Sequence, residues 1–351
     1  MLNKKKFWLG KKVLITGNTG FKGSWLTISL LELGANIIGI SSKKKGRLFI
    51  HNYLNLGKKI KQYFINILNY KSLEKIILKE KPEIIFHLAA QPIVKYSYLK
   101  PYETFCINSL GTVNLLEIIK KLKNKFAFIN ITTDKVYKQN FKNKEFRVED
   151  PLGGNDIYSG SKACSEIMTH CYYKSFFFNK NIIGIATARA GNVIGGFDWS
   201  KNRIIPDFFR SIKNNKCLKI RMPDSIRPWQ HVIDVINGYL ILAEKLYKNP
   251  TKFSKSWNFG PKRNSVKTVF ELVKLLNKIN KNKIKLLVEK SNFHEEKSIR
   301  LNTSLTTSKL KWRQKINFRN SLLLSSEIYQ KFLRKNLSYK DFKKQIQKYS
   351  N

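Results

Sequence analysis

The feature that most constrains the fold lies near the N-terminus, where a short apolar run leads into a glycine-rich turn. Val13-Leu14-Ile15-Thr16 is followed by Gly17-Asn18-Thr19-Gly20-Phe21-Lys22-Gly23, and residues 24–33 have the apolar spacing of a helix. A strand, closely spaced glycines and a helix in this order let a diphosphate approach backbone N–H groups at the helix N-terminus. The spacing is G-x-x-G-x-x-G rather than the commoner G-x-G-x-x-G, and a purely structural turn is the alternative. We expect a dinucleotide site that includes Gly17, Thr19, Gly20, Phe21 and Gly23.

Further apolar runs along the chain predict a doubly wound α/β domain. Residues 37–40, 63–67, 84–90 and 126–132 suit strands, and residues 102–122 suit a helix. Strands that alternate with helices at this spacing predict a parallel sheet, whose ligands bind at the carboxyl ends of the strands.

Several residues fall near these strand ends and are expected to contact the cofactor. They are Ser41, Asn66, Ile67, Ala89, Ala90 and, on the helix, Asn108. An acidic residue usually follows the second strand and holds the adenosine ribose, but Ser41-Ser42-Lys43-Lys44-Lys45 stands there instead. NAD and NADP therefore both remain open at this point.

A Tyr-x-x-x-Lys pair, Tyr158 and Lys162, lies in a segment that suits a helix over residues 158–178. Side chains four residues apart share one helix face, so the Lys162 ammonium is expected to lower the pKa of the Tyr158 phenol and make it a general base. Such pairs also occur by chance on many helices. Thr133, Asp134 and Lys135 follow the fifth strand, and we expect them at the same edge of the sheet as Tyr158.

Composition narrows the class of protein. The chain has 351 residues, 42% of them hydrophobic, and a formal net charge of +44. Because the lysines are spread along the whole length, we interpret this charge as compositional drift and expect no nucleic-acid partner; the alternative is a positive field that attracts an anionic substrate. The four cysteines show no Cys-x-x-Cys spacing, and no apolar run approaches the ~18 residues of a membrane span. We expect a cytoplasmic protein without a membrane contact or a metal site.

The motifs resemble the extended short-chain dehydrogenase/reductase family, within it the nucleotide-sugar 4,6-dehydratases, and among these most closely the group that acts on CDP-glucose. The stretches that carry the resemblance, besides the glycine turn and the Tyr-Lys pair, are His87-Leu88-Ala89-Ala90-Gln91-Pro92, Thr133-Asp134-Lys135-Val136-Tyr137, Ala188-Arg189-Ala190-Gly191-Asn192-Val193-Ile194-Gly195-Gly196, Asp198-Trp199 and Ile226-Arg227-Pro228-Trp229-Gln230-His231-Val232. The similarity runs from about residue 8 to about residue 330. The Arg-Pro-Trp-Gln-His and Asp-Lys elements are the specific ones.

The resemblance implies an NAD-binding Rossmann domain over residues 1–190, to which the chain returns at about 230–262. It also implies a smaller substrate-binding lobe from 191–229 and 263–335, and leaves a basic tail at 336–351. The implied cofactor is NAD, the implied substrate is CDP-glucose, and a homo-oligomer is expected. The residues expected to bind the nucleotide sugar are Gln91, Asn192, Arg203, Arg227 and His231.

The resemblance also implies roles for the catalytic residues. Tyr158 takes the proton of the sugar 4-hydroxyl, Lys162 sets the phenol's pKa, and Thr133 holds the hydroxyl. Asp134 is the acid for the departing 6-hydroxyl, and Lys135 is the base at carbon 5 or, alternatively, stabilises the enolate. A nucleotide-sugar 4-epimerase is the second possibility among enzymes, and a non-catalytic cofactor- or nucleic-acid-binding protein on the same fold is the third.

Overall fold

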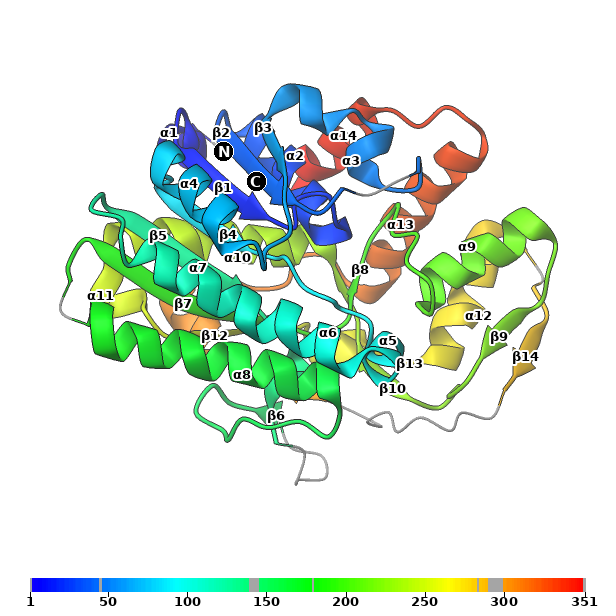
Figure 1. Cartoon of the computed structure of the whole chain (residues 1–351). Coiled ribbons are helices and arrows are strands. Elements are labelled where there is room, and N and C mark those ends of the chain that lie inside the picture. The colour runs from blue at the N-terminus through cyan, green and yellow to red at the C-terminus, as the bar shows by residue number, and fades with distance from the viewer. Residues whose placement is uncertain are drawn as a thin grey trace.

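A seven-stranded parallel sheet forms the centre of the protein, in the strand order β12-β7-β5-β4-β1-β2-β3. The computed structural model describes residues 2–43, 46–138, 145–178, 180–282, 284–289 and 299–349 (Figure 1). The strands are β1 (Lys12–Thr16), β2 (Asn36–Ser41), β3 (Lys61–Phe64), β4 (Ile84–His87), β5 (Phe126–Ile131), β7 (Ile183–Ala190) and β12 (Ser256–Phe259). The order reverses at β1, which confirms the predicted doubly wound sheet.

Helices cover both faces of the sheet because each central strand is apolar on both sides. Leu14 of β1 packs into the core formed with α4 (Tyr70–Glu80), α7 (Gly111–Ile119) and α8 (Ile157–Tyr172). Its neighbours Val13 and Ile15 pack into the opposite core, formed with α2 (Phe21–Glu32) and α10 (Val232–Lys248). Figure 1 shows α7 and α8 side by side along one face of the sheet. This burial on both faces is typical of parallel sheets.

Two predicted elements differ in detail from those observed. The third strand was expected at residues 63–67, but β3 is Lys61–Phe64, because Asn66 accepts a hydrogen bond from the Leu68 amide and begins a turn. The helix expected at residues 102–122 is built from α6 (Pro101–Phe105), a π-helical turn (Cys106–Leu110) and α7. A second π-helical turn, Tyr173–Phe177, continues α8 to the predicted end of that helix.

A smaller hydrophobic core lies beside the sheet and forms a lobe at the right of Figure 1. Its elements are α9 (Ile204–Asn214), β9 (Leu218–Ile220), α12 (Val269–Asn280), β14 (Leu286–Val288) and α13 (Phe318–Leu333). Short strand pairs join the two parts, namely β8 (Val193–Ile194) with β11 (Gln230–His231) and β10 (Ile226–Pro228) with β13 (Val266–Thr268). A further pair is β6 (Glu145–Phe146) with β15 (Arg300–Leu301).

The C-terminal part of the chain returns to the first core. Trp312 donates from Nε1 to the carbonyl of Asp234 on α10 at 3.0 Å. The stretch expected to be a basic tail contains α14 (Tyr339–Tyr349), which packs on α2: Phe342 is buried, and its ring centre lies 5.0 Å from that of Trp25. The remaining α-helices are α1 (Leu2–Trp8), α3 (Ile50–Tyr53), α5 (Val94–Leu99) and α11 (Pro250–Phe253). Within the described ranges no helix is both long enough and apolar enough to cross a membrane.

Candidate functional site

The glycine turn joins β1 to α2 at the carboxyl edge of the sheet, and its glycines are required by close backbone contacts. Gly17 has a φ of +74°, and a Cβ there would lie 2.7 Å from the Ala89 nitrogen; a Cβ on Gly23 would lie 2.2 Å from the Gly17 carbonyl oxygen. Gly20 is the N-cap of α2, and Thr19 beside it is buried. The turn therefore presents the first backbone N–H groups of α2, which lack partners within the helix, at the strand ends.

The other residues expected to contact the cofactor differ in their exposure. Ser41 lies at the end of β2, and its buried hydroxyl has no hydrogen-bond partner among the described residues. Ala89 and Ala90 follow β4 and are partly exposed. Ile67 is buried beneath α7, while Asn66 is exposed. Lys44 and Lys45 lie outside the described residues.

Asn108, which was expected to contact the cofactor, has its amide hydrogen-bonded inside the protein. Its Oδ1 accepts from the Gln91 amide at 2.8 Å, and its Nδ2 donates to the Gln91 carbonyl at 3.1 Å and to Ser161 Oγ at 2.9 Å. The side chain is 1% exposed. Asn108 thus ties the loop after β4 to α8 instead of offering its amide to a cofactor.

Tyr158 and Lys162 lie on the first turns of α8, which begins after the N-cap Asp156. Both side chains are buried, and Lys162 Nζ donates to the Ile131 carbonyl at the end of β5 at 2.9 Å. Burial lowers the pKa of Lys162 to about 8, while the Glu166 carboxylate opposes this shift. The helix therefore holds the pair against the carboxyl end of β5.

The expected lowering of the Tyr158 pKa is absent from this structure. Burial raises the pKa of Tyr158 to about 12; a hydrogen bond with Thr133 acts in the opposite direction, and the Asp134 carboxylate adds to the increase. Desolvation of the phenolate outweighs the favourable interactions, because the charged form loses its water.

Thr133 and Asp134 are positioned where β5 turns into a short 3-10 helix, Asp134–Val136. Thr133 caps this helix by accepting from the Lys135 amide at 3.3 Å and donates to Asp134 Oδ1 at 3.0 Å. Burial raises the pKa of Asp134, while the charges of Lys135 and Arg227 and the Thr133 hydrogen bond oppose the increase. A carboxyl group with a raised pKa suits a proton donor.

A buried ion pair supports the strand ends behind these residues. Arg189 on β7 donates from Nη2 to Glu166 Oε2 at 2.6 Å, and both residues are about 2% exposed. Glu166 also accepts hydrogen bonds from Thr187 and from Thr132, the residue before Thr133. The pair therefore connects α8, β5 and β7 directly beneath the candidate site.

A cavity of about 680 Å³ opens between this edge of the sheet and the smaller lobe. The sequence-predicted residues that line it are Phe21, Thr133, Asp134, Lys135, Tyr158, Asn192, Arg203 and Arg227. Sequence reasoning missed Lys22 and Gly191, which also line it. Lys22 could have been noticed as a lysine inside the glycine turn, but nothing in the sequence indicated that its side chain would point into the cavity.

Arginines give the cavity its positive character. Arg203 donates from Nη1 to Asp198 Oδ2 at 2.9 Å, and Arg227 donates from Nη1 to the carbonyl of Ile226 at 3.1 Å. Arg210 and Arg221 line the same cavity. Guanidinium groups bind diphosphate oxygens in a bidentate manner, so this wall suits a nucleotide diphosphate.

Two predicted substrate residues are not part of this cavity. Gln91 uses its amide to hold its own loop: Nε2 donates to Thr104 Oγ1 and the Ile93 carbonyl, and Oε1 accepts from the Ile93 amide. His231 is 0% exposed, caps α10 by accepting from the Ile233 amide, and packs edge-on against Trp25. Both side chains are thus enclosed by the protein in this structure, and neither is placed against the cavity.

A glycine turn on the first strand, with a Tyr-Lys pair beside the carboxyl end of β5 in a doubly wound parallel sheet, defines an extended short-chain dehydrogenase/reductase. The sequence model of the family described as GDP-mannose 4,6 dehydratase matches residues 14–323, and the chain belongs to this family.

Individual relatives agree with this assignment. The chain is 41% identical over 313 residues to CDP-glucose 4,6-dehydratase of Salmonella typhimurium, covering 88% of this chain and 87% of the relative. It is 26% identical to UDP-glucose 4-epimerase of Mycoplasma pneumoniae, covering 71% and 76% of the two chains.

Solved structures share the fold at lower identity. The UDP-glucose 4-epimerase of Thermotoga maritima, with UDP-glucose, has a TM-score of 0.81 at 24% identity and covers 92% of this chain and 99% of its own. The dTDP-glucose 4,6-dehydratase of Bacillus anthracis, in complex with NAD, has a TM-score of 0.76 at 23% identity and covers 92% and 97%.

Proposed function

We propose that the chain is a CDP-glucose 4,6-dehydratase that uses NAD. The observation that carries the proposal is that Thr133, Asp134, Lys135 and Tyr158 line one cavity with several arginines. An acid, a second titratable group and a tyrosine at one place are what oxidation followed by loss of water requires. The relative at 41% identity supports the choice of substrate.

The residues present fit a dinucleotide. The glycine turn and the first turn of α2 would hold the pyrophosphate, and the unpartnered Ser41 hydroxyl would meet the adenosine ribose. When bound, NAD would accept the hydride from carbon 4 of the sugar and return it to carbon 6. Calorimetric titration should give tighter binding of NAD than of NADP, and clearly tighter binding of NADP would overturn this part of the proposal.

The positions of these side chains in one cavity support the following proton transfers. Tyr158 takes the proton of the 4-hydroxyl, with Thr133 holding the oxygen. The resulting 4-ketone makes the proton on carbon 5 acidic, and Lys135 removes that proton. Asp134, whose pKa burial raises, donates a proton to the 6-hydroxyl so that it leaves as water.

Product analysis tests the proposal. The protein is incubated with CDP-, UDP-, dTDP- and GDP-glucose, and the products are analysed by NMR and mass spectrometry. We expect a 4-keto-6-deoxy sugar, with loss of one water, from CDP-glucose. A CDP-hexose of unchanged mass with an inverted carbon 4 would identify an epimerase instead, and no product from any sugar nucleotide would overturn the proposal.

We also propose a homo-oligomer, and an exposed apolar surface on α5, α6, the π-helical turn and α8 supports this proposal. Its members include Leu99 at 66%, Tyr102 at 82%, Leu110 at 46% and, on α8, Ile167 at 46%. Apolar patches on this scale mark protein contacts, and a second copy of the same chain supplies a matching patch. We expect Tyr102→Glu to shift sedimentation from dimer to monomer; an unchanged sedimentation coefficient would place the contact elsewhere.

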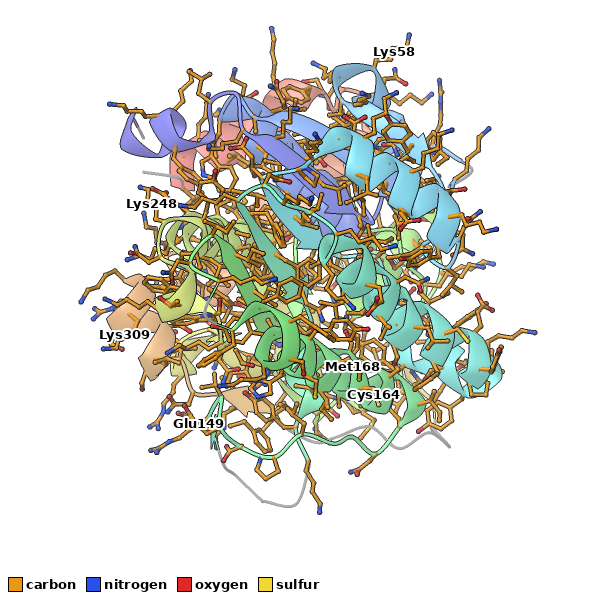
Figure 2. All side chains as sticks on the ribbon, turned by 60° about the vertical axis from the view of Figure 1, so that its left-hand side comes forward. Lys58, Glu149, Cys164, Met168, Lys248 and Lys309 are labelled. Carbon is orange, nitrogen blue, oxygen red and sulfur yellow. The ribbon has the colours of Figure 1, made fainter. Side chains whose placement is uncertain are left out.

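We further propose a cytoplasmic location and no nucleic-acid partner. All four cysteines are free, as expected in a reducing compartment. Figure 2 shows Lys58, Lys248 and Lys309 at separate places on the outside of the molecule. Cell fractionation should recover the protein with cytoplasmic markers. A salt-sensitive shift of labelled DNA would contradict the second statement.

A further inference from the structure

One buried ion pair is tied to both ends of the segment that carries the candidate acid and base. Residues 133–135 form this segment, and Thr132 and Tyr137 lie on either side of it in the chain. Before the segment, the Thr132 hydroxyl donates to Glu166 Oε1; after it, the Tyr137 hydroxyl accepts from Arg189 Nη1 at 2.6 Å. Since Glu166 and Arg189 are themselves paired, a single cluster of side chains links the two ends.

This cluster is fixed to the sheet and to α8. Arg189 Nε lies 2.9 Å from both carboxylate oxygens of Glu166, and its Nη2 donates to Ser256 Oγ at 3.1 Å. Glu166 also accepts from Thr187 Oγ1 at 3.0 Å. Ion pairs with several parallel hydrogen bonds add geometric specificity as well as energy. The segment is therefore held relative to α8, which also carries the Tyr-Lys pair.

The hydroxyl of Tyr137 is the connection between this cluster and the end of the 3-10 helix. It accepts from Arg189 and donates to Asn258 Oδ1 at 2.7 Å. The side chain is buried, and its ring stacks on Phe146 with the ring centres 4.8 Å apart. A 3-10 helix of three residues makes few hydrogen bonds of its own, so its orientation depends on the contacts at its ends.

We propose that Arg189 is a positioning residue for the loss of water: paired with Glu166 and acting through Tyr137, it holds Asp134 and Lys135 in place against the sugar. The inference rests on the proposed function, which makes Asp134 the acid and Lys135 the base. Misplacement of a reacting group by about 1 Å costs about 100-fold in rate. A side chain that fixes this segment therefore affects the reaction without touching the substrate.

Tyr137→Phe tests the connection most directly, because it removes one hydroxyl and keeps the ring. Substitution of Arg189 or Glu166 is less suitable, since loss of either leaves the other charge buried without its partner. Mixing the NAD-loaded protein with CDP-glucose in a single turnover gives two rates: nicotinamide reduction by absorbance, and loss of water by mass spectrometry of quenched samples. Tyr137→Phe should slow the loss of water by about ten- to one-hundred-fold, while nicotinamide reduction stays within about two-fold of wild type.

A double-mutant cycle with Asp134→Asn separates positioning from general damage. In the Asp134→Asn protein the acid is already absent, so adding Tyr137→Phe should change the rate of water loss by less than about three-fold. The matched control is Tyr53→Phe, which removes a hydroxyl that donates to the Leu337 carbonyl at 3.0 Å, away from the cavity. This control should leave both rates unchanged.

Loss of water at the wild-type rate in Tyr137→Phe would overturn the inference and leave the proposed function intact. Equal slowing of both steps, additive with Asp134→Asn, would also overturn it, because it indicates a general loss of structure. Should Tyr137→Phe fail to fold, Thr132→Val removes the hydroxyl at the other end of the segment. Slower nicotinamide reduction is expected there, because Thr133 is the next residue, and two wild-type rates would overturn the inference. No turnover of CDP-glucose by wild type would overturn the proposed function and this inference together.

Discussion

The carboxylate of Asp134 lies directly against Gly191, since a Cβ built on that glycine would stand 2.9 Å from Asp134 Oδ2 and 3.2 Å from Pro228 Cγ. Such a distance to Oδ2 is too short for an ordinary contact. Gly191 thus leaves room for the carboxylate at the end of β7. Its backbone φ is not in the left-handed region, so the requirement for glycine is one of space and not of backbone conformation.

Gly191→Ala should displace Asp134 or Pro228 and slow the loss of water. Because the nearest neighbours of the added methyl group are Asp134 and Pro228 and not Tyr158 or Lys162, oxidation at carbon 4 should persist, and the accumulation of reduced nicotinamide should be visible by absorbance. Misplacement of a reacting group by about 1 Å costs about 100-fold. The control is Gly160→Ala on α8, where a Cβ meets nothing within 4 Å; equal activity of the two variants would contradict the prediction.

His231→Asn should flatten the acid dependence of stability. Burial lowers the pKa of His231 to about 3, against about 6.5 in the unfolded chain. Between these values the unfolded chain binds one more proton at this site, so stability falls as the pH falls below about 6.5. Asparagine can still cap α10 but does not titrate.

Urea unfolding of wild type and His231→Asn at pH 7 and pH 5 measures this effect. The variant should lose about 2 kcal/mol less free energy of unfolding than wild type over that interval. The variant has a smaller side chain beside Trp25 and is expected to be less stable at both pH values, so the difference between the two pH values is the relevant quantity. Equal losses in both proteins would show that His231 protonates in the folded state.

His231 and Asp134 differ in how well their positions could be predicted from the sequence. Alternating strands and helices, the glycine turn and the Tyr-Lys pair are local patterns, and the sheet, the turn and α8 were predicted from them. Asp134 follows a strand whose end is fixed by the sheet, so its place at the carboxyl edge could be foreseen. His231, Gln91 and Asn108 stand in family motifs or near strand ends, but whether such a side chain faces a ligand or a neighbour depends on packing between distant segments.

The pKa values of the site residues also depend on packing between distant segments and could not be predicted from the sequence. The effect of Lys162 on the Tyr158 pKa was expected from spacing alone, which gives the separation along the helix but not the loss of solvent. In the fold, Lys162 Nζ is directed to the Ile131 carbonyl and burial dominates the pKa of Tyr158. Lys22 was overlooked for a related reason: the cations beside it, Arg203 and Lys162, come from segments more than 100 residues away.

Tyr158→Phe should remove oxidation of carbon 4, because the phenol oxygen is the proton acceptor; general acid–base contributions are typically ~10²–10⁴-fold. Burial raises the pKa of Tyr158 to about 12, so the phenolate fraction of wild type grows with pH across the neutral range. The single-turnover rate of nicotinamide reduction should therefore rise from pH 6 to pH 9 in wild type and not in the variant. Substrate binding should survive, and near-normal turnover would show that the tyrosine is structural.

Lys135→Met tests the base at carbon 5. Tyr158 and Lys162 are unchanged in this variant, so carbon 4 should still be oxidised, but the reaction should stop before water leaves and reduced cofactor should accumulate. In deuterated water the recovered sugar should carry no label at carbon 5. Asp134→Asn is the matched variant: it lacks only the acid, so it should allow exchange at carbon 5 while water loss slows. Exchange at the wild-type rate in Lys135→Met would show that another group removes the proton and that Lys135 only stabilises the enolate.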